Sequence, residues 1–257
     1  MSKINKRKLV NFANIFIGNE NYIYMKIREV ISAIVDLFYP RLCMVCGTAL
    51  TGSESYICPS CIASLPRTNF HLGMRNLAEE SFAGKAHAQK AYSWFFYSHD
   101  SKFSNLIYNF KYRGNFKLAE YLGELYAKEL RSDNIKLYFD YIIPVPLHPK
   151  RKRERGYNQS YHIAKGISRV FHNEIREDIL FRKTMTTSQT RKMRFDRWEN
   201  IKDAFEAEPA NEHNAEKEIL IVDDVTTTGA TIAACIITLR EQGYKNISVL
   251  TLAYANK

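Results

Sequence analysis

Apolar residues along the chain fall into two kinds of pattern, continuous runs and stretches with helical spacing. The continuous runs occupy 91–97, 140–147, 218–222 and 247–253. Runs of this kind are typical of strands that a parallel sheet buries on both faces. Helical spacing covers 101–112, 115–131, 157–171 and 230–242. Because strands and helices alternate from residue 140 onward, the pattern predicts an α/β fold with a parallel sheet.

The remaining segments carry weaker signals. Apolar residues at helical spacing predict an amphipathic helix over 23–38, which Pro40 ends. A short strand is expected at 179–182, whereas 62–90 reads as irregular, 148–156 as a basic loop and 184–200 as a polar loop. We therefore expect a loose tail at 1–24, a helix with a cysteine module at 25–65, and the sheet domain at 66–257.

Four of the five cysteines form two close pairs, Cys43 with Cys46 and Cys58 with Cys61. Two residues between thiolates allow a tight turn to point both sulfurs at one ion, and two such turns complete a tetrahedral site. The spacing predicts a closed, structural zinc site. A redox pair or an iron–sulfur cluster stays an alternative. Cys235 stands alone in a predicted helix, where we expect it to fill the core.

The run 219–231 combines acids, hydroxyl residues and a glycine. A buried strand leads into Asp223 and Asp224, and a loop of small residues then opens a helix; the loop consists of Val225, Thr226, Thr227, Thr228, Gly229, Ala230 and Thr231. Backbone amides at a helix N-terminus suit a phosphate, and Gly229 allows the backbone to approach closely. The adjacent acids can accept hydrogen bonds from sugar hydroxyls, directly or with Mg²⁺.

This run resembles the 5-phosphoribosyl-1-diphosphate (PRPP) motif of type I phosphoribosyltransferases. The resemblance implies that Asp223 and Asp224 contact the ribose 2′ and 3′ hydroxyls and that Thr226–Thr231 wrap the 5-phosphate. Some purine-specific members carry an acid where this chain has Thr227, and its absence here argues against purine salvage.

Further segments resemble the ComF family over about residues 25–254. They are the run IPVPLHPKRKRERGYNQ at 143–159, Gln189-Thr190 with Arg194, Arg197, Asn200 and Ala204-Phe205, the segment KYRG at 111–114, and the cysteine module. The resemblance implies a type I phosphoribosyltransferase-like parallel sheet with helices on both faces and a small N-terminal zinc-finger module. It also implies a role in natural competence, the uptake of DNA for transformation, with the competence machinery as partner.

The net charge of +10 is concentrated in one segment, because residues 150–200 alone carry +8 and residues 201–257 carry −4. A local positive field points to an anionic partner. The candidates for contact with the pyrophosphate of PRPP or with nucleic acid are Lys150, Arg151, Arg153, Arg155, Arg191, Arg194 and Arg197. Trp198 is the best candidate for stacking on an unpaired base.

Two functions fit these observations. The first is a Mg²⁺-dependent transfer of phosphoribosyl from PRPP to an acceptor that the sequence does not reveal. The second is a non-catalytic protein that binds single-stranded DNA, with PRPP as a regulatory ligand. No apolar run approaches the roughly 18 residues of a membrane helix, and no secretory signal is evident, so a cytoplasmic location is expected.

Overall fold

The computed structural model describes residues 40–52, 54–73, 76–135, 138–183 and 204–255. The chain divides into two compact units, Met1–Ile62 and Ala63–Lys257. In the described part of the first unit, an isolated antiparallel bridge joins Leu42 to Ala49. The short helix α2 (Pro59–Ala63) begins in this unit. Throughout the described residues, no helix combines the length and the apolar character of a membrane span.

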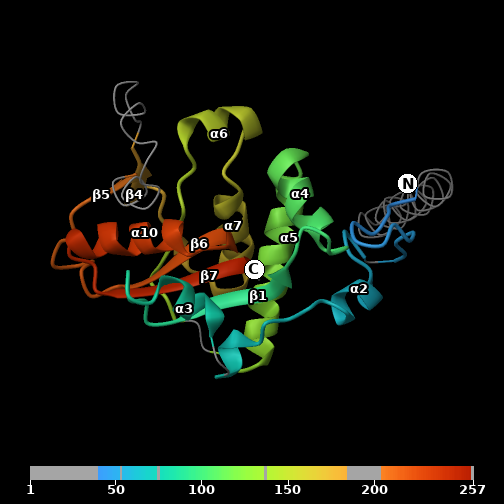
Figure 1. The fold of residues 1–257 in the computed structure, drawn as a ribbon, viewed down its shortest axis with the longest axis horizontal. Coiled ribbons are helices and arrows are strands. Elements are labelled where there is room, and N and C mark those ends of the chain that lie inside the picture. The colour runs from blue at the N-terminus through green and yellow to red at the C-terminus, as the bar shows by residue number, and fades with distance from the viewer. Residues whose placement is uncertain (1–39, 53, 74–75, 136–137, 184–203, 256–257) are drawn as a thin grey trace, which may run out of the picture. The chain divides into compact units, whose positions relative to one another are not determined.

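The second unit is built on a five-stranded sheet in which every strand is parallel to its neighbours. Figure 1 labels β1, β6 and β7 of this sheet. The strand order is β1-β7-β6-β2-β3. The bounds are β1 Ala91–Tyr97, β2 Tyr141–Pro144, β3 Glu174–Ile175, β6 Glu218–Thr226 and β7 Asn246–Ala255. A separate antiparallel pair consists of β4 (Leu180–Arg182) and β5 (Phe205–Ala207). The predicted parallel α/β sheet is therefore confirmed.

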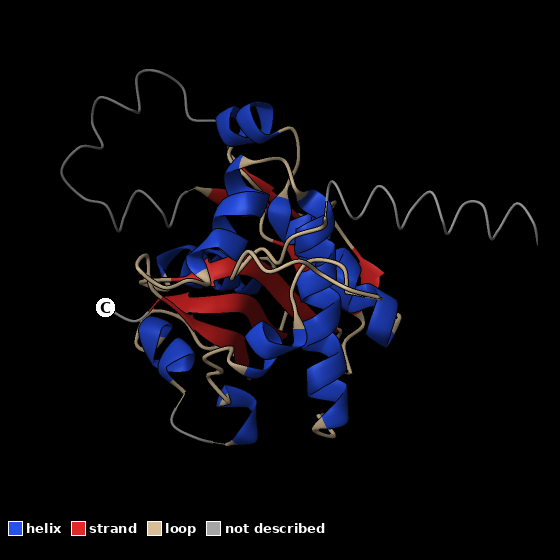
Figure 2. Ribbon diagram, turned by 90° about the vertical axis from the view of Figure 1, so that its right-hand side faces the viewer, coloured by secondary structure: helices blue, strands red, loops and turns tan. Residues whose placement is uncertain are grey.

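Helices cover both faces of this sheet (Figure 2). The helices are α3 Leu77–Phe82, α4 Ser104–Tyr112, α5 Phe116–Ser132, α6 Pro149–Arg155, α7 Gln159–Phe171 and α10 Ala230–Glu241, with a 3-10 turn η1 at Phe70–Leu72. On one face, strand residues such as Ile143, Ile221 and Val249 pack against α10 and α3 in one apolar cluster. On the other face, α7 packs on β6 and β2. Alternate residues of each strand thus feed two separate apolar layers.

Two segments differ from the sequence-based expectation. The basic stretch read as a loop contains the helix α6, in which Pro149 is the first residue and the side chain of His148 accepts a hydrogen bond from the Lys150 N–H. Lysine, arginine and glutamate favour helices, and Gly156 ends this one at a φ of 78°. The stretch 62–90, read as irregular, contains α3, which Asn76 caps by accepting hydrogen bonds from two N–H groups.

Helices α5 and α7 approach each other so closely that only glycine fits at two positions. A Cβ atom on Gly123 would lie 2.3 Å from the carbonyl oxygen of Ile163, and one on Gly166 would lie 2.0 Å from that of Glu120. Backbone therefore packs against backbone where the two helices cross. This contact fixes α7 relative to α5.

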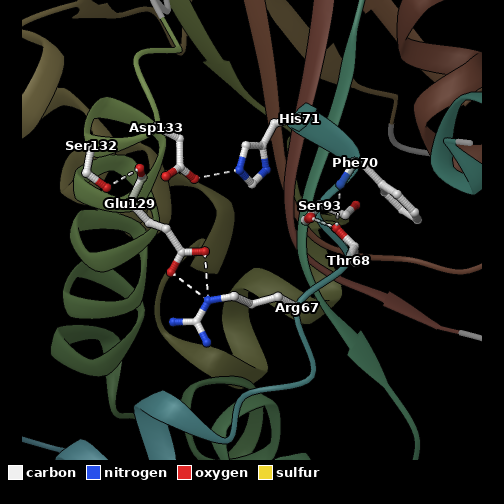
Figure 3. Close-up of polar contacts among 8 residues, drawn as sticks. All are labelled: Arg67, Thr68, Phe70, His71, Ser93, Glu129, Ser132 and Asp133. Atoms are coloured by element: carbon white, nitrogen blue, oxygen red, sulfur yellow. Dashed lines mark hydrogen bonds and ion pairs between the residues drawn. The ribbon is translucent and has the colours of Figure 1, made fainter. Parts of the chain in front are cut away.

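The segment before β1 is tied to α5 by an ion pair and a hydrogen bond (Figure 3). Arg67 Nε lies 2.9 Å from a carboxylate oxygen of Glu129, and His71 Nε2 lies 2.8 Å from Asp133 Oδ2. The Thr68 hydroxyl donates a hydrogen bond to the carbonyl of Ser93, so the same segment also holds β1. These contacts order the polypeptide that leads into the edge of the sheet.

Candidate functional site

The sheet is wound in opposite directions from a switch point between β2 and β6, and open α/β sheets have a crevice at the carboxyl ends of the strands at such a point. The chain leaves β2 through α7 on one face to reach β3, whereas it leaves β6 through α10 on the other face to reach β7. In open α/β sheets, ligands bind outside the carboxyl ends of the strands at such a switch point. The acidic pair and the threonine loop both lie at this end of β6.

The start of α7 supplies partners for both acids of the pair. The Ser160 hydroxyl donates to Asp223 Oδ1 at 2.9 Å, and Gln159 Nε2 donates to Asp224 Oδ2 at 2.8 Å. Asn158 donates from Nδ2 to the Val145 carbonyl at 3.0 Å and so fixes the start of α7 to the end of β2. The N-terminus of α7 is thereby locked beside the carboxylates.

A lysine from α4 completes the site. Lys111 Nζ lies 2.9 Å from Asp224 Oδ1, and the Asp224 side chain is almost fully buried. Gln159 is also buried, yet its Oε1 accepts no hydrogen bond from any described residue. Asp223 Oδ2 likewise has no hydrogen-bond partner within the described ranges. Asp223, which is only partly buried, can therefore offer an oxygen acceptor to a ligand hydroxyl, whereas the Gln159 oxygen is enclosed by protein.

Asp223 has an unusual acidity. Burial, together with the nearby charge of Asp224, raises the pKa of Asp223 from 3.8 to about 7, although the Ser160 hydroxyl and the backbone N–H of Asp224 oppose this. The folded chain therefore favours the protonated form of this carboxyl more than an exposed aspartate does. A ligand cation such as Mg²⁺ would favour the ionised form.

The loop after the acids starts later than the sequence pattern indicates. Strand β6 continues through the acidic pair to Thr226, because it pairs with β7 as far as Tyr254. Thr227 and Thr228 are exposed, and Gly229 precedes α10 with a φ of 68°. Within the loop that is expected to bind phosphate, Thr227 and Thr228 are therefore the exposed threonines.

Gly229 has a structural role that the sequence did not indicate. A Cβ atom there would lie 2.6 Å from Ser81 Oγ and 2.9 Å from the Ser81 carbonyl oxygen. The close approach observed at Gly229 is therefore that of α3. A role toward phosphate remains a prediction.

The basic helix α6 borders a cleft next to the acidic pair. Figure 1 shows α6 projecting from the rest of the second unit. The cleft has a volume of about 480 Å³ and is lined by Lys111, Tyr112, Gly114, Arg151, Glu154 and Arg155. Lys111 thus lines the cleft while it pairs with Asp224. Lys150 and Arg153 are also exposed on α6, so this helix carries further cations besides those that line the cleft.

Some predicted site residues lie outside the described residues. They are Arg191, Arg194 and Arg197, together with the stacking candidate Trp198. His148 is the cap of α6, and burial followed by the neighbouring cations lowers its pKa. A neutral imidazole is suited to accept the backbone hydrogen bond that it receives.

The four cysteines of the first unit form one cluster in which all sulfur atoms lie within 4.8 Å of one another. Sulfurs bound to a tetrahedral zinc at about 2.3 Å lie about 3.8 Å apart, and the Cys46 and Cys58 sulfurs are separated by 3.7 Å. No disulfide bond joins any two of these four cysteines. The cluster can therefore hold a metal ion with the ligand spacing of zinc.

Local backbone geometry explains how the cysteine turns form. In the first turn, the Gly47 N–H donates to the Cys43 carbonyl at 2.9 Å, with Gly47 at a φ of 74°. In the second turn, the Cys61 N–H donates to the Cys58 carbonyl at 3.0 Å at the start of α2. Such turns aim both sulfurs of each pair to one side. Cys235, by contrast, is buried in α10, as expected of a core residue.

Three residues that contact the acidic pair were missed by the sequence analysis, namely Lys111, Gln159 and Ser160. Lys111 and Gln159 lie within motifs that carry the ComF resemblance, but their partners are more than 60 positions away in the chain. No local pattern links them to the acids. Their polar character at the start or end of a helix was the available signal.

Comparison with curated proteins gives relatives with related names, whereas no family model matches the chain. The chain is 33% identical over 156 residues to competence protein F of Haemophilus influenzae, covering 59% of this chain and 68% of that protein. It is 29% identical over 215 residues to the DNA utilization protein YhgH of Shigella flexneri, covering 82% and 89% respectively. With competence protein ComFC of Bacillus subtilis, it shares 28% over 153 residues, or 57% of each chain.

Among solved structures, the purine phosphoribosyltransferase of Pyrococcus horikoshii matches with a TM-score of 0.32 and 15% identity, over 53% of this chain and 80% of that one. A likeness of this degree supports no conclusion about activity. The sequence relatives are sufficient for the family, since the match to competence protein F exceeds 30% identity over two thirds of its length. The chain belongs to the ComF family of competence proteins.

Proposed function

We propose that this protein binds PRPP with Mg²⁺ in the crevice between β2 and β6, and that it does so in the uptake or use of DNA. The observation that carries the proposal is the acidic pair, which Lys111, Gln159 and Ser160 hold at the switch point of the sheet. The names of the relatives, competence protein F and DNA utilization protein, support the role in DNA metabolism.

Each part of PRPP has a complementary group in the second unit. A ribose hydroxyl would donate to Asp223 Oδ2, which has no donor among the described residues. The 5-phosphate would lie at the exposed hydroxyls of Thr227 and Thr228, before the N-terminus of α10. The pyrophosphate would extend into the cleft beside Lys111.

If phosphoribosyl is transferred, the bond between ribose C1 and the pyrophosphate oxygen breaks and its electron pair leaves with the pyrophosphate. Negative charge then grows on the leaving group, where Lys111, Arg151 and Arg155 line the cleft. Fixed cations aimed at developing charge stabilise a transition state more than the ground state. Mg²⁺, when bound with PRPP, would neutralise further phosphate charge.

The four cysteines are proposed to hold one structural Zn²⁺. Cys43, Cys46, Cys58 and Cys61 supply four thiolates, which leaves no open position for a substrate or a water molecule. Metal binding would fix the two cysteine turns relative to each other and so stabilise the small first unit.

Single-stranded DNA is a second proposed ligand, and the observation that favours it is α6. Lys150, Arg151, Lys152 and Arg153 are exposed there, and they form no ion pair with a described residue. Unpaired cations on a projecting helix attract phosphates independently of sequence. In this case PRPP would regulate binding.

The test of PRPP binding is calorimetry on the full chain with Mg·PRPP. Replacing both acids, Asp223→Asn with Asp224→Asn, is expected to remove the binding heat. The matched control is Asp178→Asn, because Asp178 pairs with Arg176 at the surface. Unchanged affinity in the double variant would contradict the assignment of the crevice. Release of pyrophosphate from PRPP in the presence of nucleobases, amines or single-stranded DNA would then separate transfer from binding alone.

A further inference from the structure

A second pocket shares Lys111 and Thr227 with the proposed PRPP site, and the proposed function gives no role to its aromatic lining. Its volume is about 260 Å³, and its lining residues are Tyr97, His99, Ile107, Tyr108, Lys111, Tyr112, Val225 and Thr227. They come from the carboxyl ends of β1 and β6 and from α4. Pockets for drug-sized ligands usually measure ~300–1,000 Å³. This one is small and suits a single ring system.

The walls of the pocket are aromatic. Tyr108 and Tyr112 lie one helical turn apart on α4, with ring centroids 5.3 Å from each other, and they are 48% and 65% exposed. Large aromatic side chains at such exposure contribute little to the core, and a group of them marks a binding site more often than an isolated one does. Arginines lie over both rings, Arg113 over Tyr108 and Arg155 over Tyr112.

The floor of the pocket carries polar groups. The Tyr97 hydroxyl and His99 Nδ1 are 3.1 Å apart, and their rings pack edge to face. Lys111 lines the pocket and pairs with Asp224 at 2.9 Å, so one side chain touches both the pocket and the acidic pair. Thr227, at the rim, belongs to the loop assigned to the phosphoribosyl group.

We propose that this tyrosine pocket, formed by Tyr97, His99, Tyr108 and Tyr112, binds the planar ring of a nucleobase next to the ribose-binding acids. The inference rests on the proposed function for the position of the ribose. Nucleobases stack on tyrosine rings, and their ring nitrogens and exocyclic groups exchange hydrogen bonds with hydroxyl and imidazole groups. Ammonia or a small amine would leave the aromatic walls unused.

The nucleobase can come from a mononucleotide or from single-stranded DNA, since both present the same ring. A mononucleotide would place its ribose 5-phosphate at the acids and the threonine loop. A strand would place one base in the tyrosine pocket and its phosphates along the cations Arg113, Arg151 and Arg155, which lie on α6 and at the end of α4. Both sources require the same stacking contact with Tyr108.

The experiment compares dissociation constants on the full chain by calorimetry with Mg²⁺ present. The probes are PRPP, ribose 5-phosphate, the four nucleoside 5′-monophosphates and a ten-residue oligothymidylate. We expect at least one monophosphate, or the oligothymidylate, to bind about tenfold tighter than ribose 5-phosphate. The variant Tyr108→Ala should remove this gain and leave the affinities for PRPP and ribose 5-phosphate unchanged.

The control variant Tyr108→Phe keeps the ring and should keep most of the gain. If only the oligothymidylate depends on Tyr108, the base comes from a strand, and if the monophosphates depend on it, the base comes from a nucleotide. The inference is overturned if PRPP binds while neither Tyr108 variant alters the affinity for any base-containing probe. Absence of PRPP and ribose 5-phosphate binding would instead contradict the proposed function, and the Tyr108 dependence of the oligothymidylate would still test the pocket.

Discussion

The cysteine cluster and the acidic crevice are both polar sites, but the chain builds them in different ways. The cysteines span 19 residues, and hydrogen bonds inside two short turns aim their sulfurs. The acids need Lys111 and Gln159, which reach them from other elements across more than 60 positions. A local site can be recognised from residue spacing alone, whereas an assembled site needs the fold.

The largest effect is expected from removal of a cysteine, because the described part of the first unit has only an isolated bridge and the start of a short helix besides the cysteine turns. Cys43→Ser should reduce bound zinc from about one ion per chain to near zero and make the segment 40–62 sensitive to protease. Cys235→Ser is the matched control, because it alters a buried cysteine in α10 and should leave the zinc content unchanged. Metal analysis of both purified variants checks this. Loss of zinc in both would show that the cluster depends on the second unit after all.

The next effect concerns the acidity of Asp223. Its pKa of about 7 lies above the ordinary 3.8. Between about pH 4 and 7, Asp223 therefore keeps a proton in the folded chain that it has already lost in the unfolded chain. Folding stability therefore falls as pH rises through that window and levels off above it. Asp223→Asn should be more stable than the parent chain by about 2–4 kcal/mol at pH 8, with little difference near pH 4.

Urea unfolding at several pH values measures this difference. Asp178→Asn serves as the control, because Arg176 lowers the pKa of Asp178 and its contribution is therefore lost only as pH falls below the ordinary range. The slope of stability between pH 5 and 7 should thus remain in the control and decrease in Asp223→Asn. A gain for Asp223→Asn that is independent of pH would show that the carboxyl is ionised throughout.

An effect of similar size is expected at Gly229, and it tests whether contacts between distant segments hold the site together. Gly229→Ala adds a methyl group to a residue at positive φ and 2.9 Å from the Ser81 carbonyl, so it should lower the free energy of unfolding by about 2–4 kcal/mol. Gly114→Ala shares the positive φ but has open space around its Cβ, and should cost about 1 kcal/mol. If chemical denaturation shows the same loss of unfolding free energy in both variants, the contact between Gly229 and α3 adds nothing to the cost.

The smallest effect concerns α6. The double variant Arg151→Glu with Arg153→Glu should weaken binding of single-stranded DNA and reduce the slope of log affinity against log salt by about 1–2. Lys217→Glu with Lys245→Glu is the control, because both lysines lie near the amino-terminal ends of β6 and β7. Fluorescence titrations at several salt concentrations measure the slopes. An equal change in both variants would point to a general charge effect.

Strong periodicity made most of the sheet unit predictable. The strand 91–97 was predicted with its observed bounds, and the helices before and after Gly114 were predicted within a few residues. Helix α6 was missed because its residues are nearly all charged, so no apolar spacing reveals a helix. Helix α3 was missed because six residues are too few for a periodic pattern, although Asn76 followed by Glu79 is a capping signal.

The candidate site was predictable in its acids and loop but not in their surroundings. Adjacent acids after a continuous apolar run are visible in the sequence, because the run alone indicates a buried strand. Lys111 pairs with Asp224 only because α4 follows β1 at the edge of the sheet, and the tyrosine pocket depends on the same placement. Such contacts follow from the order of the strands, which hydrophobic periodicity does not encode.

Substitutions at the glycine contact between α5 and α7 are expected to disturb the acidic pair, although the glycines lie outside the candidate site. Gly166 lies seven residues after Gln159, or about 10 Å along the helix axis. A methyl group at Gly166 would collide with the backbone of α5, so α7 would have to tilt away. This tilt would displace the first turn of α7, which holds the two acids. Loss-of-function alleles are therefore expected at Gly123 and Gly166, which bind nothing, as well as among the residues that would touch a ligand.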